Sequence, residues 1–346
     1  MRAAVISVTE KGRGLSERIA AALDGHEVRR YCSEKHTDAG AMTYERIAAL
    51  TAELWDRTDA LIFVCACGIA VRCIAPHVTS KLKDPAVIAA DDCGRFVIPL
   101  LSGHIGGANA LAERLAQGLG ATAVITTATD IGGLFSPDSF AAANGLIITD
   151  MGAAKQIATA VLGGERIGLV SDVPCLNTPA QIAAGSEAQG LHYGIQIGGS
   201  AEPKPFPMTL RLLPKNIVLG IGCKRGTSAQ TIARTAEAAL SAAGIPSERV
   251  CGAASIDLKS DEEGLREFCR ERELPIEFFT ADELSEVGGE FTASEFVRSV
   301  TGVDNVCERS AVKRGGRLIM KKYAGGGVTV AAAELPIVLD FERKML

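Results

Sequence analysis

The sequence predicts an α/β protein with a parallel-sheet amino-terminal domain, a small mixed α/β central region and a compact α/β carboxy-terminal domain. Short apolar runs alternate with amphipathic helical patterns toward both ends of the chain, which is typical of a mostly parallel sheet covered by helices. Charged residues make up 22% and aromatic residues 5% of the 346 residues, as is ordinary for this class. We expect units at residues 1–130, 131–214 and 215–346, because a chain of this length can bury several cores.

The elements of the first unit follow from the spacing of its apolar residues. Apolar positions three and four apart indicate helices, whereas short continuous apolar runs between turn residues indicate buried strands. The predicted helices span 15–23, 44–54 and 108–119, and the predicted strands span 3–8, 60–65, 87–91, 97–101 and 123–126.

The central region has fewer signals. A helix is predicted at 153–162 and a strand at 167–170. The segment from Glu202 to Pro207 is rich in proline and predicts a linker, with a Pro-rich edge strand as the alternative.

The last unit begins with a buried strand at 217–223. Thr227 or Ser228 is the expected N-cap of a helix over 229–243, which Gly244 ends. The remaining predicted strands span 253–258, 276–280, 317–321 and 327–332, and the remaining helices span 261–272 and 294–301.

Composition narrows the function classes. The formal net charge is −5 and there is no basic block, so nucleic acid and membrane surfaces are poor partners. The apolar run at 3–8 is too short to span a bilayer and no signal peptide precedes it, so we expect a cytoplasmic protein. The ten cysteines form no C-x-x-C pair, so we expect no zinc or other protein-bound metal. The tightest group, Cys65, Cys67 and Cys73, is interpreted as small buried hydrophobes.

The glycine-rich segment from Ser102 to Asn109 opens a predicted helix and suggests an anion site. Gly103, Gly106 and Gly107 would let backbone N–H groups approach a ligand beside the partly positive helix start. The alternative is that these glycines only make a tight strand-to-helix connection. Nucleotide binding is disfavoured, because neither G-x-x-x-x-G-K-[ST] nor G-x-G-x-x-G occurs there.

Several segments together resemble one known family, the CbiG proteins, which are the cobalt-precorrin 5A hydrolases of the anaerobic cobalamin pathway. The resemblance covers nearly the whole chain. The segments that carry it are Gly68–Arg72, Ile74–Val78, Lys81–Pro85, Ala90–Asp92, Gly94–Asn109, Thr126–Asp130, Leu219–Ser228, Ala254–Lys259, Phe278–Phe279, Ser294–Val297 and Gly325–Val330.

The resemblance implies a reaction and its ligand. Family members add water to the δ-lactone of cobalt-precorrin 5A, and the methylated meso carbon leaves as acetaldehyde to give cobalt-precorrin 5B. No organic cofactor is expected, and cobalt arrives within the corrinoid substrate. The protein partners to consider are neighbouring pathway enzymes and a second copy of this chain in a homodimer. The alternative is a non-catalytic protein that carries a corrinoid intermediate.

Lactone opening needs a positioned water, a proton acceptor and donors for the oxyanion. His104 is the first candidate for general base or acid, against the alternative of a buried histidine tied to backbone. Asp91 and Asp92 end a predicted strand, where one could orient His104 or the water and the other could simply begin a turn. Ser102 is also a candidate, but no G-x-S-x-G surrounds it, so direct water attack is favoured over a serine nucleophile.

The acetate and propionate arms of a corrinoid need cations. Arg72 and Arg225 rank first because arginine binds carboxylates in a bidentate manner. Lys224 and Arg225 at a helix start oppose the macrodipole unless an anion lies beside them, and simple solvation is the alternative. The further candidates for substrate binding are Lys81, Lys83, Asn109, Thr227, Ser228 and the glycines of the Ser102–Asn109 segment. Asp257 and Lys259 receive no role, and Gly325–Gly327 could admit a flat ligand closely.

Overall fold

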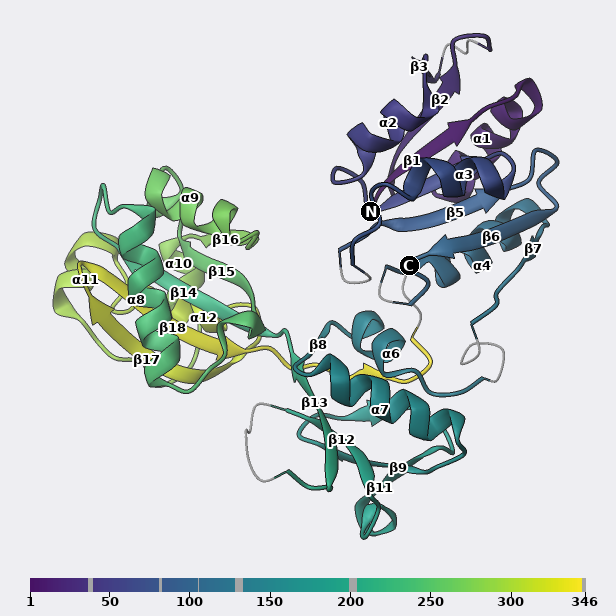
Figure 1. Cartoon of the computed structure of the whole chain (residues 1–346). Helices are drawn as coiled ribbons and strands as arrows, with labels where there is room; N and C mark the ends of the chain where they lie inside the picture. Colours follow the sequence, from purple (N-terminus) through teal and green to yellow (C-terminus); the bar gives the residue numbers. More distant parts are fainter. Residues whose placement is uncertain (37–39, 81–82, 105, 128–132, 199–203, 344–346) are drawn as a thin grey trace.

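The computed structural model describes residues 1–36, 40–80, 83–104, 106–127, 133–198 and 204–343. Figure 1 shows three lobes, and each is built on its own β-sheet with helices packed against it. The predicted α/β class is therefore confirmed. Within the described residues, no helix is both long enough and apolar enough to cross a membrane.

The amino-terminal domain contains a seven-stranded sheet of order β3-β2-β1-β4-β5-β6-β7. Five strands, β1 to β5, are parallel, whereas β6 pairs antiparallel with β5 and β7 follows the direction of β6. The strand bounds are β1 Arg2–Ser7, β2 Glu27–Ser33, β3 Met42–Tyr44, β4 Ala60–Val64, β5 Ala86–Ala90, β6 Phe96–Leu101 and β7 Thr122–Ala123.

Helices cover both faces of this sheet, so its central strands are apolar along their whole length. In β1, Val5 faces the core that contains α1 (Glu10–Ala22) and α4 (Ala108–Leu119). The next residue, Ile6, faces the core beneath α2 (Ile47–Leu54) and α3 (Cys67–Ile74), as the two-residue period of a strand requires.

The central domain has a five-stranded sheet of order β11-β9-β12-β13-β8. Its bounds are α6 Pro137–Ala143, β8 Leu146–Ile148, α7 Met151–Leu162, β9 Ile167–Ser171, β10 Cys175–Leu176, β11 Ile182–Ala184, a 3-10 helix at Gly185–Ala188, β12 Tyr193–Ile197 and β13 Met208–Pro214. Both expected elements, the helix near 153–162 and the strand near 167–170, are confirmed.

The Pro-rich segment before β13 is not a linker. Phe206 is 6% exposed and packs where Gly168 and Gly194 lack side chains. A Cβ built on either glycine would lie 2.3 and 2.0 Å from the Phe206 ring, so both positions need glycine. The edge-strand alternative is also wrong, because β13 begins at Met208 and is internal, between β12 and β8. Glu202 and Pro203 lie outside the described residues.

The end of the chain returns to the central domain, which corrects the expected unit at 215–346. Strand β19 (Leu339–Asp340) pairs with β10, and Phe341 stacks on Phe140 with ring centroids 4.2 Å apart. Leu339 is buried in the central core. The carboxy-terminal domain is therefore an insertion within the central domain, and its last strand in Figure 1 leads back toward α6. The expected boundary at 130 lies outside the described residues.

The inserted domain has a five-stranded sheet of order β16-β15-β14-β18-β17. Helices α8 and α9 cover one face, and α12 packs against the other at Gly220, where a Cβ would lie 1.8 Å from the carbonyl oxygen of Cys307. The bounds are β14 Ile217–Cys223, α8 Ala229–Ala242, β15 Val250–Ile256, α9 Glu263–Glu271, β16 Ile276–Phe279, α10 Ala281–Ser285, α11 Glu295–Thr301, α12 Cys307–Val312, β17 Arg317–Gly325 and β18 Val328–Glu334, with 3-10 turns at Ser247–Arg249 and Asp257–Lys259.

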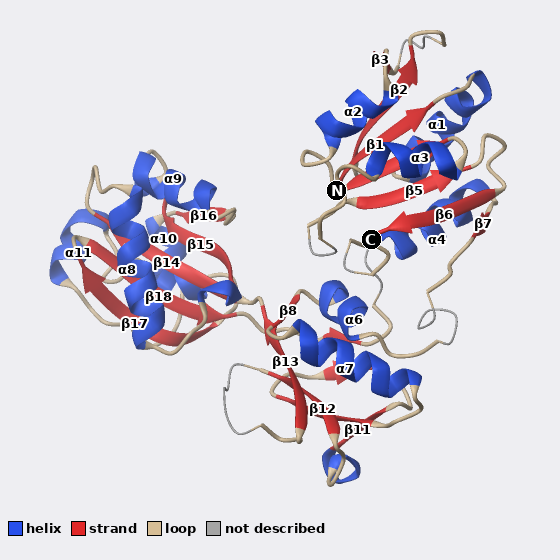
Figure 2. Ribbon diagram, viewed as in Figure 1, coloured by secondary structure: helices blue, strands red, loops and turns tan. Residues whose placement is uncertain are grey.

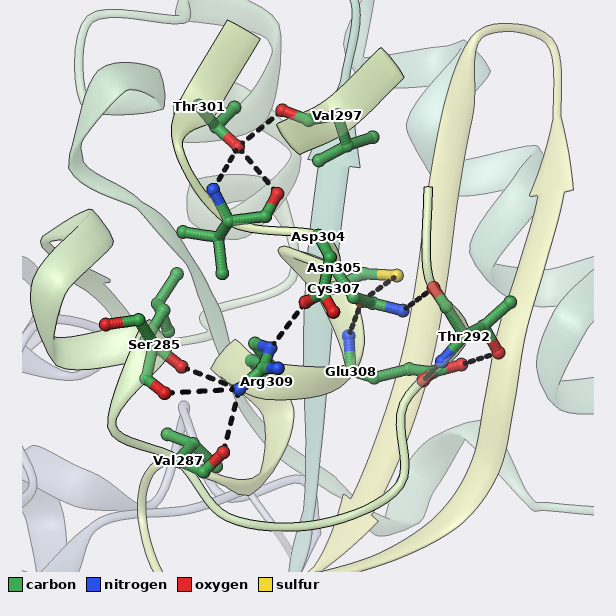
Figure 3. Close-up of polar contacts among 12 residues, drawn as sticks. Ser285, Val287, Thr292, Val297, Thr301, Asp304, Asn305, Cys307, Glu308 and Arg309 are labelled. Atoms are coloured by element: carbon green, nitrogen blue, oxygen red, sulfur yellow. Dashed lines mark hydrogen bonds and ion pairs between the residues drawn. The ribbon is translucent and has the colours of Figure 1, made fainter. Parts of the chain in front are cut away.

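A buried polar network fixes the long segment that leads into α12 (Figure 3). The Glu308 carboxylate is fully buried and accepts hydrogen bonds from the Thr292 amide, the Thr292 hydroxyl and the Lys322 amide at 2.7, 2.8 and 2.7 Å. Arg309 pairs with Asp304 at 2.9 Å and donates to the Val287 carbonyl at 2.8 Å. These contacts satisfy buried charges and backbone groups that would otherwise destabilise the fold.

Candidate functional site

The direction of β6 separates the residues that the sequence placed in one site. In the antiparallel pair, Leu101 lies opposite Val87 at the start of β5, and Val97 lies opposite Ala90 at its end. Ser102 therefore follows β6 at the edge where the parallel strands begin, which we call the amino-end edge. Asp91 and Asp92 follow β5 at the opposite, carboxyl-end edge. Figure 2 shows β5 and β6 side by side and pointing in opposite directions.

The two edges are too far apart for the expected pairing of His104 with Asp91 or Asp92. Strand β5 has 5 residues, and a strand rises about 3.3 Å per residue, so its ends are roughly 15 Å apart. The expectation that one of these aspartates orients His104 is therefore wrong.

The amino-end edge brings together several segments that carry the family resemblance. The Ser102 hydroxyl donates a 2.9 Å hydrogen bond to the carbonyl oxygen of Asp84. The side-chain amide of Asn109 donates a 2.8 Å hydrogen bond to the hydroxyl of Thr127, which follows β7. Helix α3 runs back toward the same edge and carries the exposed Arg72 in its last turn. We call Asp84, Ser102, His104, Asn109 and Thr127 the amino-end cluster.

The Ser102–Asn109 loop is closed by backbone hydrogen bonds between its own residues. The amides of Gly107, Ala108 and Asn109 donate to the carbonyls of His104, Ser102 and Gly103 at 3.0, 3.1 and 3.0 Å. The Gly107 amide is therefore engaged within the loop, so the expectation that it approaches a ligand is wrong for this glycine.

Close packing explains the glycines of this loop. A Cβ on Gly106 would lie 2.4 Å from the Cβ of Ser102, and a Cβ on Gly103 would lie 2.7 Å from Oδ1 of Asn109. Ser102 itself has a positive φ of 57°, which is unusual for a residue with a side chain. Ile105 lies outside the described residues.

At the carboxyl-end edge, Asp91 is a turn residue. Its carboxylate accepts hydrogen bonds from the amides of Arg95 and Phe96, both at 2.7 Å, and of Cys93 at 3.3 Å. Burial raises the pKa of Asp91, but these bonds outweigh it and the pKa is lowered overall. Asp91 thus matches the expectation that one of the two aspartates begins the turn.

The strand order reverses between β1 and β4, and Asp92 reaches from the end of β5 to Thr9, just after β1, at the carboxyl-end edge. Its Oδ2 accepts a 2.8 Å hydrogen bond from Thr9, the N-cap of α1. Its Oδ1 is buried, and no donor among the described residues reaches it. Ligands of open α/β sheets bind where the strand order reverses, so Asp92 stays a candidate while Asp91 does not.

The cysteines at positions 65, 67 and 73 of the amino-terminal domain are only partly as expected. Cys65 and Cys73 are buried as expected, whereas Cys67 is partly exposed. Burial raises the pKa of the Cys65 thiol to about 12, which makes it a poor nucleophile at neutral pH. Within the described ranges, no group of three or more His, Cys, Asp or Glu residues could hold a metal ion.

In the inserted domain, the segment from Lys224 to Ser228 follows β14 and is braced from within. Ser228 is the N-cap of α8 and accepts a bond from the Thr231 amide, while the Thr227 hydroxyl donates to the Lys224 carbonyl at 2.7 Å. The expected capping role is therefore confirmed for Ser228, and both hydroxyls are engaged in shaping this turn.

The sequence analysis missed Glu262, which organises this turn. Its carboxylate is 5% exposed and accepts hydrogen bonds from the Gly226 amide and the Lys259 ammonium, both at 3.0 Å. Arg225 lies 3.0 Å from Asp261 and 3.7 Å from Glu262. For Arg225, the anion expected beside this helix start is thus supplied by the protein itself.

The other cations differ in their surroundings. Lys224 is exposed, and its methylene stem crosses Gly327, where a Cβ would lie 3.1 Å from Cδ. Gly326 and Gly327 have φ values of 57° and 79°, so the turn between β17 and β18 requires them. Lys83 is exposed, and Lys81 lies outside the described residues.

Two family models match this chain. The model described as Cobalamin synthesis G N-terminal matches residues 49–130, and the model described as Cobalamin synthesis G C-terminus matches residues 217–333. The second match has nearly the same bounds as the inserted domain.

Curated relatives match along most of the chain. The protein named Cobalt-precorrin-5A hydrolase from Salmonella typhimurium is 33% identical, covering 94% of this chain and 96% of the relative. A protein of the same name from Priestia megaterium is 31% identical, covering 84% and 82%. A solved structure described as a putative cobalamin biosynthesis protein G homolog from Sulfolobus solfataricus is 25% identical, covers 96% of this chain and 97% of that one, and has a TM-score of 0.45.

Proposed function

Because this chain belongs to the cobalt-precorrin-5A hydrolase family, we propose that it hydrolyses cobalt-precorrin 5A in cobalamin biosynthesis. The single observation that carries the proposal is the 33% identity, over 94% of this chain, with a protein named for that activity. Matches to both family models, in the expected order, support it.

The proposed reaction is the addition of water to the δ-lactone carbonyl, with loss of acetaldehyde and formation of cobalt-precorrin 5B. Cobalt belongs to the substrate, and the proposal requires no organic cofactor and no protein-bound metal. The protein must bind a macrocycle with many carboxylates, accept a proton from water and stabilise an oxyanion. The proposed cellular location is the cytoplasm.

The proposed catalytic position is the amino-end cluster. His104 is the general base or acid, because it is the histidine of the loop that Ser102 and Asn109 hold against neighbouring segments. Ser102 serves to hold that loop rather than as a nucleophile, since its hydroxyl already donates to Asp84. Asp92, at the opposite edge, is the alternative base.

The proposed contacts with substrate carboxylates come from cationic side chains of two domains. Arg72 is exposed beside the amino-end edge. Lys224 is exposed on the inserted domain, whereas Arg225 would have to exchange Asp261 for a substrate carboxylate. Thr227 and Ser228 would then act by shaping this loop.

Acetaldehyde release tests the proposal. The purified full chain is incubated under anaerobic conditions with cobalt-precorrin 5A and an aldehyde trap, with heat-inactivated protein as the control. We expect stoichiometric acetaldehyde and cobalt-precorrin 5B without added cofactor. Tight binding of the corrinoid without aldehyde would instead identify a carrier, and a strict need for a nucleotide or redox cofactor would refute the hydrolytic reaction.

A further inference from the structure

We propose that Asp84 is a positioning residue for the reaction, because it connects the Thr79–Ser80 backbone to the loop that carries His104. This inference rests on the proposed function, since it assigns Asp84 to the His104 site. It concerns a carboxylate that is 5% exposed and does not itself contact the reacting atoms.

The carboxylate of Asp84 is held from one side of the cluster. Oδ2 accepts hydrogen bonds from the amides of Thr79 and Ser80 at 3.0 and 2.9 Å, and Oδ1 accepts the Thr79 hydroxyl at 2.9 Å. Hydrogen bonds to a buried carboxylate are among the strongest in proteins. The side chain therefore fixes the position of its own backbone.

The carbonyl oxygen of Asp84 carries this constraint to the catalytic loop. It accepts the Ser102 hydroxyl at 2.9 Å. The next residue is Pro85, which disfavours the helical conformation for the backbone of Asp84. The acceptor is thus aimed by the carboxylate bonds on one side and by proline on the other.

Ser102 in turn contacts the loop and the start of α4. Its φ of 57° is unfavourable for serine and must be held by surrounding contacts. Its carbonyl accepts the Ala108 amide at 3.1 Å, and its side chain packs against Gly106. A displacement of Ser102 therefore moves the loop on both sides of His104.

Loss of this alignment should affect turnover more than binding. A misplacement of about 1 Å can cost about 10²-fold in rate, because catalysis depends on near-attack geometry. The corrinoid arms would be bound mainly by cations elsewhere. We expect Asp84→Asn to lower kcat by roughly 10- to 100-fold with a change in KM of less than about threefold.

A double-mutant cycle tests the route through Ser102. If Asp84 acts by holding Ser102, the variant with both Asp84→Asn and Ser102→Ala should lose little more activity than Ser102→Ala alone. Additive losses would overturn the proposal. Thr79→Val removes one bond to the carboxylate and should give a smaller loss, which Thr79→Ser should restore; this pair keeps the test valid if Asp84→Asn folds poorly.

Hydrogen exchange supplies a readout that does not depend on activity. The amides of Ala108 and Asn109 should exchange faster in Asp84→Asn than in the wild-type chain, while the amides of α7 should not change. Asp150→Asn is the matched control, because Asp150 also accepts two backbone amides, at 2.7 and 3.1 Å, but in the central domain. It should leave kcat unchanged.

The two proposals fail in different ways. If the wild-type chain releases no acetaldehyde, the proposed function fails. Faster exchange at Ala108 and Asn109 in Asp84→Asn would still show that Asp84 holds the Ser102–Asn109 loop in place. If the wild-type chain is active and Asp84→Asn keeps normal kcat, the positioning role of Asp84 is overturned while the proposed function stands. Unchanged exchange at both amides would overturn it as well.

Discussion

The backbone amide of Gly226 donates a 3.0 Å hydrogen bond to the nearly buried carboxylate of Glu262. Glu262 also binds Lys259, so one side chain holds a glycine turn and balances a cation that follows the neighbouring strand. Asp84 does a comparable task in the amino-terminal domain. In both domains, a buried acidic residue from another segment contacts the candidate ligand loop, Glu262 through its carboxylate and Asp84 through its backbone carbonyl.

Replacing Glu262 by Gln should change how stability depends on pH. Burial raises the pKa of Glu262, but bonds from Gly226 and Lys259 outweigh it, so the folded-state pKa lies below its ordinary 4.5. A lowered pKa contributes stability that is present above the unfolded-state pKa and is lost as pH falls through the folded-state pKa. Glu262→Gln should therefore lower Tm at pH 7, and the difference from wild type should shrink below about pH 4.5.

Thermal unfolding between pH 3 and 7 measures this effect. Glu263→Gln is the control, because Glu263 is the neighbouring carboxylate and is exposed. It should show a small Tm change throughout. A Tm difference for Glu262→Gln that stays constant across the range would contradict the assigned role of its charge.

The inserted domain should fold when separated from the rest of the chain. Its two ends are adjacent, since Ile217 pairs with Glu334 and the Leu335 amide donates to the Asn216 carbonyl at 2.9 Å. The Arg249 guanidinium joins the segments that enter and leave the domain, because it donates hydrogen bonds to the side chains of Asn216 at 2.9 Å and Glu334 at 2.8 Å. We expect residues 216–335 alone to unfold cooperatively, because the domain has its own core.

Circular dichroism and hydrogen exchange test this separation. The complementary chain, with residues 217–334 replaced by a short Gly-Ser linker, should keep its central domain folded. A fragment ending at 346 but starting at 216 is the informative control: its tail contains Leu339 and Phe341, which belong to the other core, and should gain no protection. An unfolded 216–335 fragment would disprove the insertion as an autonomous unit.

Glu308→Ala should strongly destabilise the inserted domain. The change removes the buried carboxylate that accepts hydrogen bonds from the Thr292 amide, the Thr292 hydroxyl and the Lys322 amide, and a hydrogen bond to a charged group contributes about 1.5–3 kcal/mol. We expect a loss of about 3 kcal/mol or more in the free energy of unfolding, measured by urea denaturation. Glu286→Ala removes an exposed carboxylate 3.9 Å from Lys313 and should change stability by less than about 0.5 kcal/mol.

Apolar periodicity was sufficient for the central elements but not for strand direction. The strand over 217–223 and the helix over 108–119 match the structure, because one is a continuous apolar run and the other is strongly amphipathic. The antiparallel direction of β6 was signalled by the short Asp91–Arg95 connection, which is too short for a parallel crossover. This short connection therefore places His104 and Asp91 at opposite edges of the sheet.

Other features depend on contacts between distant segments. Helix α3 was not predicted because Ile69 and Val71 are exposed, at 36% and 46%, so its apolar residues do not form one buried stripe. Glu262 and Asp84 look like ordinary surface carboxylates in the sequence. Their burial arises from the folded arrangement of the chain, which local patterns do not encode.

Replacing Arg72 by Ala should weaken binding of the carboxylate arms. We expect an increase in KM or Kd with little change in kcat, because arm binding is similar in the ground and transition states. Arg225→Ala should have a smaller effect, since Arg225 is already paired with Asp261 at 3.0 Å. Equilibrium titration with the corrinoid measures both. Normal binding by both variants would exclude these arginines from the substrate site.

Replacing His104 by Ala should distinguish the two edges of the amino-terminal sheet. A general base contributes about 10²–10⁴-fold in rate, so kcat should fall by that range while corrinoid binding persists. Tm should change little, because His104 is in a loop and its removal opens no core cavity. His192→Ala, an exposed histidine beside Tyr193 in the central domain, is the control and should keep normal kcat. If His104→Ala turns over normally while Asp92→Asn is inactive yet folded, the reaction takes place at the carboxyl-end edge, where Asp92 and Thr9 meet.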